Sequence, residues 1–121
     1  MKRILAVDDE PHILKLVAFS LKSGGFDVVE ASDGLSAIAM AESEHPDLIL
    51  LDVMMPVLDG YETCRRLKEN PATRDIPVVM LTAKTQMTEQ KNGMESGATE
   101  YVCKPFTPKE LVAQVRGFLG E

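Results

Sequence analysis

The side chains that could carry chemistry in this chain each come directly after one of its short apolar runs. Carboxylates with no cysteine or histidine close by are typical ligands of Mg²⁺ or Mn²⁺, and much less so of zinc or copper. An aspartate can also act as a nucleophile toward phosphorus, while a hydroxyl and an ammonium group can bind the oxygens of a phosphoryl group. The residues in question are Asp8, Asp9, Asp52, Thr82 and Lys104.

These residue types indicate metal-assisted phosphoryl chemistry if the fold brings them together. Three neighbouring carboxylates repel one another, and a divalent cation is the natural compensation. We expect Asp9 and Asp52 to bind Mg²⁺ directly, Asp8 to act through water, and a backbone carbonyl after Asp52 to complete the metal shell. The remaining oxygen of Asp52 would accept the phosphoryl group, with Lys104 neutralising charge and Thr82 donating a hydrogen bond.

Five apolar runs alternate with five amphipathic segments, which predicts five βα units. The run at residues 47–53 is apolar almost throughout, as a strand covered on both faces requires. Pro11 opens the first helix, Ser32 or Asp33 caps the second with Leu35, Ile38 and Ala41 facing inward, and Thr107 with Glu110 forms a capping box for the last. We expect strands at residues 4–7, 26–31, 47–53, 77–81 and 101–103. The first helix should run from Pro11 to the stop at Gly24, and the second should begin after its cap. The third should run from the end of the loop at 54–60 to about residue 69, the fourth over roughly 85–96, and the last from Pro108 to about residue 119.

This alternation predicts one α/β domain over residues 1–121. Right-handed crossovers favour a doubly wound parallel sheet with helices on two faces, and five strands favour the flavodoxin-like order 2-1-3-4-5. Ligands of such sheets bind beyond the carboxyl ends of the strands, where the strand order switches. Strands 1 and 3 flank that switch, so the polar residues after them are expected to meet there.

Composition excludes several classes of function. The 19 acidic and 13 basic residues give a net charge of −6, which argues against direct binding to nucleic acid. No apolar run approaches the length of a membrane span, and Asp8 interrupts the first run too early for a signal peptide. Cys64 and Cys103 lack metal-ligand spacing and suit reduced thiols, so we expect a cytoplasmic protein without a membrane contact.

Taken together and in order, these motifs resemble the receiver domain of two-component response regulators, including the chemotaxis regulators. A single motif of this kind would be weak, but the series covers essentially the whole chain and falls at the strand ends. The matching segments are Ile4-Leu5-Ala6-Val7-Asp8-Asp9-Glu10, Leu50-Leu51-Asp52-Val53-Met54-Met55-Pro56 with Asp59-Gly60, Leu81-Thr82-Ala83, Gly97-Ala98 and Tyr101-Val102-Cys103-Lys104-Pro105-Phe106.

The resemblance implies a signalling switch that catalyses only its own phosphorylation and dephosphorylation. A sensor histidine kinase or a histidine phosphotransfer protein would supply the phosphoryl group, and a downstream protein or a fused output domain would respond. The resemblance assigns phosphorylation to Asp52, Mg²⁺ binding to Asp8, Asp9, Asp52 and the Met54 carbonyl, and phosphoryl sensing to Thr82 and Lys104. It also implies a switch role for Tyr101 and a cis bond before Pro105.

Three alternatives stay open at this point. A flavodoxin-type cofactor site would need a phosphate-binding loop after the first strand, where Asp8 and Asp9 stand instead. A phosphatase with an aspartyl nucleophile would need a general acid where Met54 stands. A receiver fold could also serve only as an interaction module. Finally, residues 85–96 hold few apolar residues and several poor helix formers, which predicts the least stable helix, as a switching surface would require.

Overall fold

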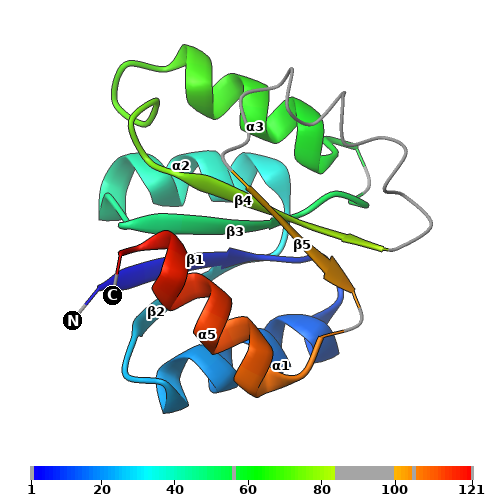
Figure 1. Cartoon of the computed structure of the whole chain (residues 1–121). Coiled ribbons are helices and arrows are strands. Elements are labelled where there is room, and N and C mark those ends of the chain that lie inside the picture. The colour runs from blue at the N-terminus through cyan, green and yellow to red at the C-terminus, as the bar shows by residue number, and fades with distance from the viewer. Residues whose placement is uncertain (1, 56, 84–99, 105, 121) are drawn as a thin grey trace.

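The computed structural model describes residues 2–55, 57–83, 100–104 and 106–120. Strands and helices alternate along this part of the chain (Figure 1). Their bounds are β1 (Arg3–Val7), α1 (Pro11–Ser23), β2 (Asp27–Ala31), α2 (Gly34–Glu44), β3 (Leu48–Asp52), α3 (Gly60–Glu69), β4 (Val78–Ala83), β5 (Glu100–Lys104) and α5 (Pro108–Phe118). The helix expected at residues 85–96 lies outside the described residues.

The strands form one parallel sheet in the order β2-β1-β3-β4-β5, which confirms the predicted doubly wound topology. The central strand β3 is buried at every position, as its unbroken apolar run predicted. Strand β2 lies at the edge, and its mixture of polar and apolar residues suits a strand covered less completely. Some strand ends differ from the predicted ones by one or two residues. Such differences are expected, because the ends of an element are less well determined than its centre.

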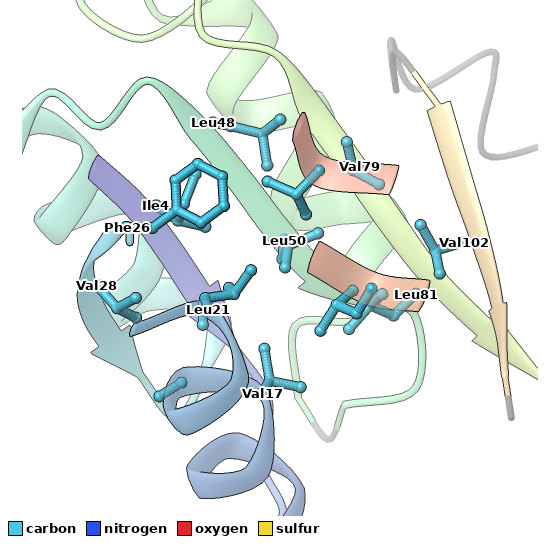
Figure 2. Packing of buried hydrophobic residues seen from close by; sticks show 14 of the residues in the cluster. Ile4, Val17, Leu21, Phe26, Val28, Leu48, Leu50, Val79, Leu81 and Val102 are labelled. Carbon is cyan, nitrogen blue, oxygen red and sulfur yellow. The ribbon is translucent and has the colours of Figure 1, made fainter. Parts of the chain in front are cut away.

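Helices α1 and α5 cover one face of the sheet, and α2 and α3 cover the other (Figure 1). Successive strand residues therefore enter different cores, since side chains alternate across a strand. Ile4 and Leu50 join the core beneath α1 and α5, where Leu21 and Phe26 pack against them (Figure 2). Leu5 and Leu51 join the core beneath α2 and α3.

Short polar residues determine where the helices begin. The Asp33 carboxylate accepts a hydrogen bond from the Ser36 backbone N–H at 2.7 Å, which identifies Asp33 as the cap of α2. Asp59 caps α3 in the same way. The predicted capping box of α5 is confirmed, because Glu110 N–H donates to Thr107 Oγ1 and Thr107 N–H donates to the Glu110 carboxylate.

The expectation that Leu35 faces inward is wrong, since 60% of this residue is exposed. Helix α2 instead buries Gly34, Ala37 and Ala41. A Cβ atom at Gly34 would collide with the Thr63 hydroxyl of α3, so the two helices approach closely through small residues. Leu35 lies on the side of α2 that does not take part in this close approach, since most of it is exposed.

Leu16 of α1 is also an exposed leucine, with 46% of the residue accessible to solvent. His12 and His45 are exposed, and Cys64 is buried. Within the described residues, no helix combines the length and the apolar character that crossing a membrane requires.

Candidate functional site

The candidate site lies where β1 and β3 end side by side. Val7, the last residue of β1, is paired with Leu51 of β3, so the residue that follows each of them stands at the same edge of the sheet. These residues are Asp8 and Asp52, and both are buried, with 2% and 5% exposure. The sheet register therefore places two carboxylates from distant parts of the chain next to each other.

Asp9 completes a cluster of three carboxylates. One ligand oxygen from each of Asp8, Asp9 and Asp52 lies within 4.8 Å of the other two. Burying two carboxylates beside a third is unfavourable unless a cation or hydrogen bonds compensate the charge. The donor set consists only of oxygen atoms, so its chemistry fits a hard divalent cation such as Mg²⁺.

A local turn holds Asp8 in its buried position. Its Oδ1 atom accepts a hydrogen bond from the Glu10 backbone N–H at 2.9 Å, and its own backbone N–H donates to the Ala31 carbonyl at 3.2 Å. The first bond orients the carboxylate and the second ties the end of β1 to β2. Asp8 is thus held in place by backbone groups, while Asp9 lies closer to solvent.

The backbone around Asp52 is held from two sides. Val53 N–H donates to the Leu81 carbonyl of the neighbouring strand at 3.1 Å, and Gly60 N–H donates to the Val53 carbonyl at 2.9 Å. Gly60 packs directly on the Asp52 backbone, because a Cβ atom there would overlap the Asp52 carbonyl oxygen and lie 2.8 Å from Val53 Cα. The first turn of α3 therefore rests on the strand end that presents Asp52.

Gly60 is a positioning residue whose role the sequence reasoning missed. The Asp59-Gly60 pair belongs to the family motifs, but the motif alone gives no reason for the glycine. The available signal was a glycine directly after a helix cap and close in sequence to a candidate nucleophile, which suggests close backbone approach. Val57, in the same loop, has a positive φ of 67° and a fully exposed side chain.

Thr82 and Lys104 are brought to the same edge of the sheet by strand pairing. Asp52 pairs with Leu81, so Thr82 stands one residue beyond Asp52's partner on β4. Thr82 pairs with Cys103 on β5, and Lys104 pairs with Ala83. The strand register is thus compatible with the expected convergence on Asp52. Pro105 lies outside the described residues, and the Met54 side chain is exposed while that of Met55 is buried.

Tyr101 of β5 is partly buried against the core beneath α2 and α3, which Tyr61 also contacts. Burial, with smaller contributions from Tyr61 and Cys64, raises the pKa of Tyr101 to about 12. The phenol is therefore neutral across the physiological pH range. Its position on an outer strand gives it access both to the core and to the surface.

Comparison with known proteins shows one family over nearly the whole chain. The sequence model of the response regulator receiver domain matches residues 4–116. The chain is 46% identical to the "DNA-binding dual master transcriptional regulator RpaA" of Synechocystis, over 98% of this chain and 49% of that protein. The chain spans about half the length of the curated relatives it matches, such as this one.

Solved structures agree with the sequence comparison. The chemotaxis protein CheY4 of Vibrio cholerae superposes with a TM-score of 0.91 at 34% identity, covering 97% of this chain and 98% of that one. The receiver domain of the sensor histidine kinase PA1611 of Pseudomonas aeruginosa, solved with a magnesium ion coordinated in its active-site cleft, superposes with a TM-score of 0.89 at 32% identity. That match covers 99% of this chain and 98% of the other.

Proposed function

This chain belongs to the response regulator receiver domain family, and from that premise we propose that it is switched by a phosphoryl group carried on Asp52. The observation that supports this assignment is the cluster of Asp8, Asp9 and Asp52, whose ligand oxygens lie within 4.8 Å of one another. Asp52 combines a buried carboxylate with a backbone held by two neighbouring elements. A nucleophile needs such a defined position.

Mg²⁺ is the proposed cofactor, held by Asp9, Asp52 and the Met54 carbonyl, with Asp8 acting through water. When bound, it would neutralise part of the carboxylate charge and of the charge on the phosphoryl oxygens. The donor set of the cluster supports this choice, since it offers oxygen atoms only.

The proposed reaction transfers a phosphoryl group from a phosphohistidine to Asp52. A carboxylate oxygen of Asp52 forms a bond to phosphorus as the P–N bond breaks, and the imidazole leaves with the bonding electron pair and takes up a proton. Lys104 would neutralise charge on the phosphoryl oxygens, and the Thr82 hydroxyl would donate a hydrogen bond to one of them. Both roles are supported by the strand pairing, since β4 pairs with β3 and β5 pairs with β4, so that their ends reach the same edge of the sheet.

The proposed switch is a shift between two arrangements of the sheet edge. Thr82 would favour the arrangement in which it reaches the phosphoryl group, and Tyr101 would move further into the core to fill the space. The face that carries β5 and α5 would change as a result. A neutral, partly buried phenol suits this role, because no charge has to be desolvated when the ring moves inward.

The proposed phosphodonor is a sensor histidine kinase or a histidine phosphotransfer protein in the cytoplasm. The proposed responder is a separate target protein or an output domain joined to the receiver. The relative RpaA is named as DNA-binding, and this chain spans about half its length. Because residues 1–121 carry a net charge of −6, we propose that they contact proteins and not DNA itself.

A mass measurement tests the proposal. Incubation with acetyl phosphate and Mg²⁺ should add the mass of one phosphoryl group to the intact protein, and Asp52→Ala should abolish the addition. Asp75→Ala is the matched control, because this exposed aspartate precedes β4 at the opposite edge of the sheet. Unmodified protein after incubation would indicate instead a receiver fold that serves only as an interaction module. Labelling that persists in Asp52→Ala would refute Asp52 as the phosphoacceptor and assign the phosphoryl group to another residue.

A further inference from the structure

Two buried side chains hold the loop at residues 53–60, which joins β3 to α3. These are Met55 and Leu58, with 7% and 8% exposure. Val57, which stands between them in the sequence, is fully exposed. The loop is therefore attached to the interior on both sides of a residue that contributes nothing to the packing.

Leu58 packs on the start of α2. Its side chain is buried and yet belongs to neither of the two cores that lie beneath the helices. It lies against Gly34, since a Cβ atom on that glycine would come within 2.9 Å of Leu58 Cδ2 and 3.1 Å of Leu58 Cβ. A side chain at residue 34 would therefore displace Leu58, and the glycine lets the loop rest directly on the helix.

The backbone that follows Leu58 is held by α3. Thr63 is fully buried, and its hydroxyl donates a hydrogen bond to the Asp59 carbonyl at 2.8 Å. The Thr63 backbone N–H donates to the same carbonyl at 3.0 Å, and the Asp59 carboxylate accepts from Glu62 N–H at 2.9 Å. With Asp59 fixed in this way, the Leu58 side chain is directed onto Gly34.

Val57 has a backbone conformation that is unfavourable for valine. Its φ is 67°, in the left-handed region, where the Cβ atom of an L-residue comes too close to the following carbonyl oxygen. A β-branched residue keeps such a conformation only when the surrounding structure holds it there. The exposed Val57 side chain gains no burial in return. The inward attachments at Met55 and Leu58 are what maintain this shape of the loop.

The loop has room to change shape if Leu58 is shortened. A small open cavity of about 290 Å³ lies beside Leu58, and its lining residues are Asp33, Gly34, Leu35, Val57 and Leu58. Removing the Leu58 side chain beyond Cβ would extend this cavity. The loop could then relax the left-handed conformation of Val57 by moving into the space, and Met54 at the start of the loop would move with it.

We propose that Leu58 is a positioning residue that holds the Met54 carbonyl in place for Mg²⁺. This role rests on the function proposed above, in which that carbonyl binds the metal. The Met54 side chain is 63% exposed and gives the residue little anchorage of its own, so its position depends on the rest of the loop. Asp8 and Asp52 are held by other backbone hydrogen bonds, and loss of the Leu58 side chain therefore acts on the affinity for the metal.

Titration of the whole unphosphorylated chain with Mg²⁺, followed through its amide NMR signals, tests this role. Leu58→Ala should weaken Mg²⁺ binding by about tenfold, as the loss of a group that orients a metal ligand typically does. Leu58→Met keeps the volume of the side chain and should bind Mg²⁺ as the unaltered protein does. Adding Val57→Asn to Leu58→Ala should recover part of the affinity, because asparagine tolerates the left-handed conformation and removes the tendency to relax.

Two control variants separate positioning from a loss of stability. Leu67→Val shortens a leucine of α3 that is buried in the core beneath α2 and α3, and it should lower the midpoint of urea denaturation without changing Mg²⁺ binding. Leu35→Ala removes a leucine that lines the same cavity and is 60% exposed, and it should leave both unchanged. Unchanged Mg²⁺ affinity in Leu58→Ala, no recovery in Leu58→Met or with Val57→Asn, or an equal loss in Leu67→Val would overturn the proposal.

Labelling by acetyl phosphate separates the role of Leu58 from the phosphoacceptor function. Leu58→Ala should need about tenfold more Mg²⁺ for half of its maximal labelling rate, and its rate at saturating Mg²⁺ should equal that of the unaltered protein. A rate that stays low at saturating Mg²⁺ would show that Asp52 itself is displaced and would overturn the proposed role. An unaltered protein that binds Mg²⁺ and is never labelled would end the phosphoacceptor proposal, while the Mg²⁺ titrations would still decide the role of Leu58. An unaltered protein that binds no Mg²⁺ would overturn both.

Discussion

Gly60 offers the sharpest test of how the fold supports Asp52. Replacing it with alanine adds one methyl group that the structure cannot accept without movement. The new Cβ atom would lie 2.8 Å from Val53 Cα and 3.1 Å from the Asp52 carbonyl carbon, and closer still to the Asp52 carbonyl oxygen. Ordinary contacts between such atoms are about 3.5–4.0 Å, so the first turn of α3 or the end of β3 has to shift by roughly 0.7 Å.

The free energy of unfolding of Gly60→Ala should fall by about 2 kcal/mol. Overpacking in a filled interior costs roughly 1–3 kcal/mol, and here the opposing atoms are backbone atoms that cannot rotate away. The higher helix propensity of alanine offsets part of that cost, by less than about 1 kcal/mol. Urea denaturation should show a lower midpoint with an unchanged slope. Labelling by acetyl phosphate should slow, because the Asp52 backbone is displaced.

Gly117→Ala provides the matched control. This glycine lies in α5, and a Cβ atom there would meet nothing within 4 Å. The substitution should raise stability by about 0.5–1 kcal/mol and leave labelling unchanged. If Gly60→Ala were as stable as the unaltered protein and labelled at the same rate, the positioning role of Gly60 would be refuted.

Three further outcomes follow from the charges and hydrogen bonds of the fold. Asp8→Asn should raise the free energy of unfolding of the metal-free protein by about 1 kcal/mol, because it relieves repulsion between the carboxylates. The same variant should lose a stabilisation of similar size that Mg²⁺ gives to the unaltered protein. Thermal unfolding with and without a chelator measures both effects. Tyr101 holds its proton in the folded state up to a pKa of about 12, so its contribution to stability is complete below pH 10 and is lost as the pH rises toward 12. The chain has two tyrosines, so an absorbance titration of Tyr101→Phe should lack the phenol transition near pH 12. A titration curve like that of the unaltered protein would show that this transition does not belong to Tyr101. Lys68→Met should lower the free energy of unfolding by about 1–2 kcal/mol, as urea denaturation would measure. The reason is that Lys68 Nζ donates hydrogen bonds to the backbone carbonyls of Ile76 at 2.6 Å and Arg74 at 3.2 Å. An unchanged midpoint would show that water replaces those hydrogen bonds.

Much of the fold could be predicted because its signals are local. The apolar run at β3 predicted a strand buried on both faces, and every residue of β3 is buried. Asp33 and Thr107 predicted helix starts, and both cap a helix through hydrogen bonds within three residues. The handedness of the βα crossovers limited the sheet to a doubly wound topology, and the order 2-1-3-4-5 came from the flavodoxin-like arrangement of five strands together with the family resemblance.

The candidate site could be predicted only as a set of residues. The positions of Asp8 and Asp52 after apolar runs indicated that they would share one edge of the sheet, and their carboxylates do lie together there. Their burial and the hydrogen bond from Glu10 N–H to Asp8 could not be predicted. The close contact of Gly60 with the Asp52 backbone depends on how α3 packs, which no local pattern contains.

By itself, the sequence determined the alternation of strands and helices, the helix caps and the polar residues that end the strands. These properties follow from side-chain periodicity and from hydrogen bonds between near neighbours, which the chain carries wherever it lies in space. Tertiary structure alone decided that α2 buries alanines and exposes Leu35, and that Leu58 packs on Gly34. Those outcomes depend on how closely elements from distant parts of the chain can approach, and that distance is set by the volumes of all the side chains between them.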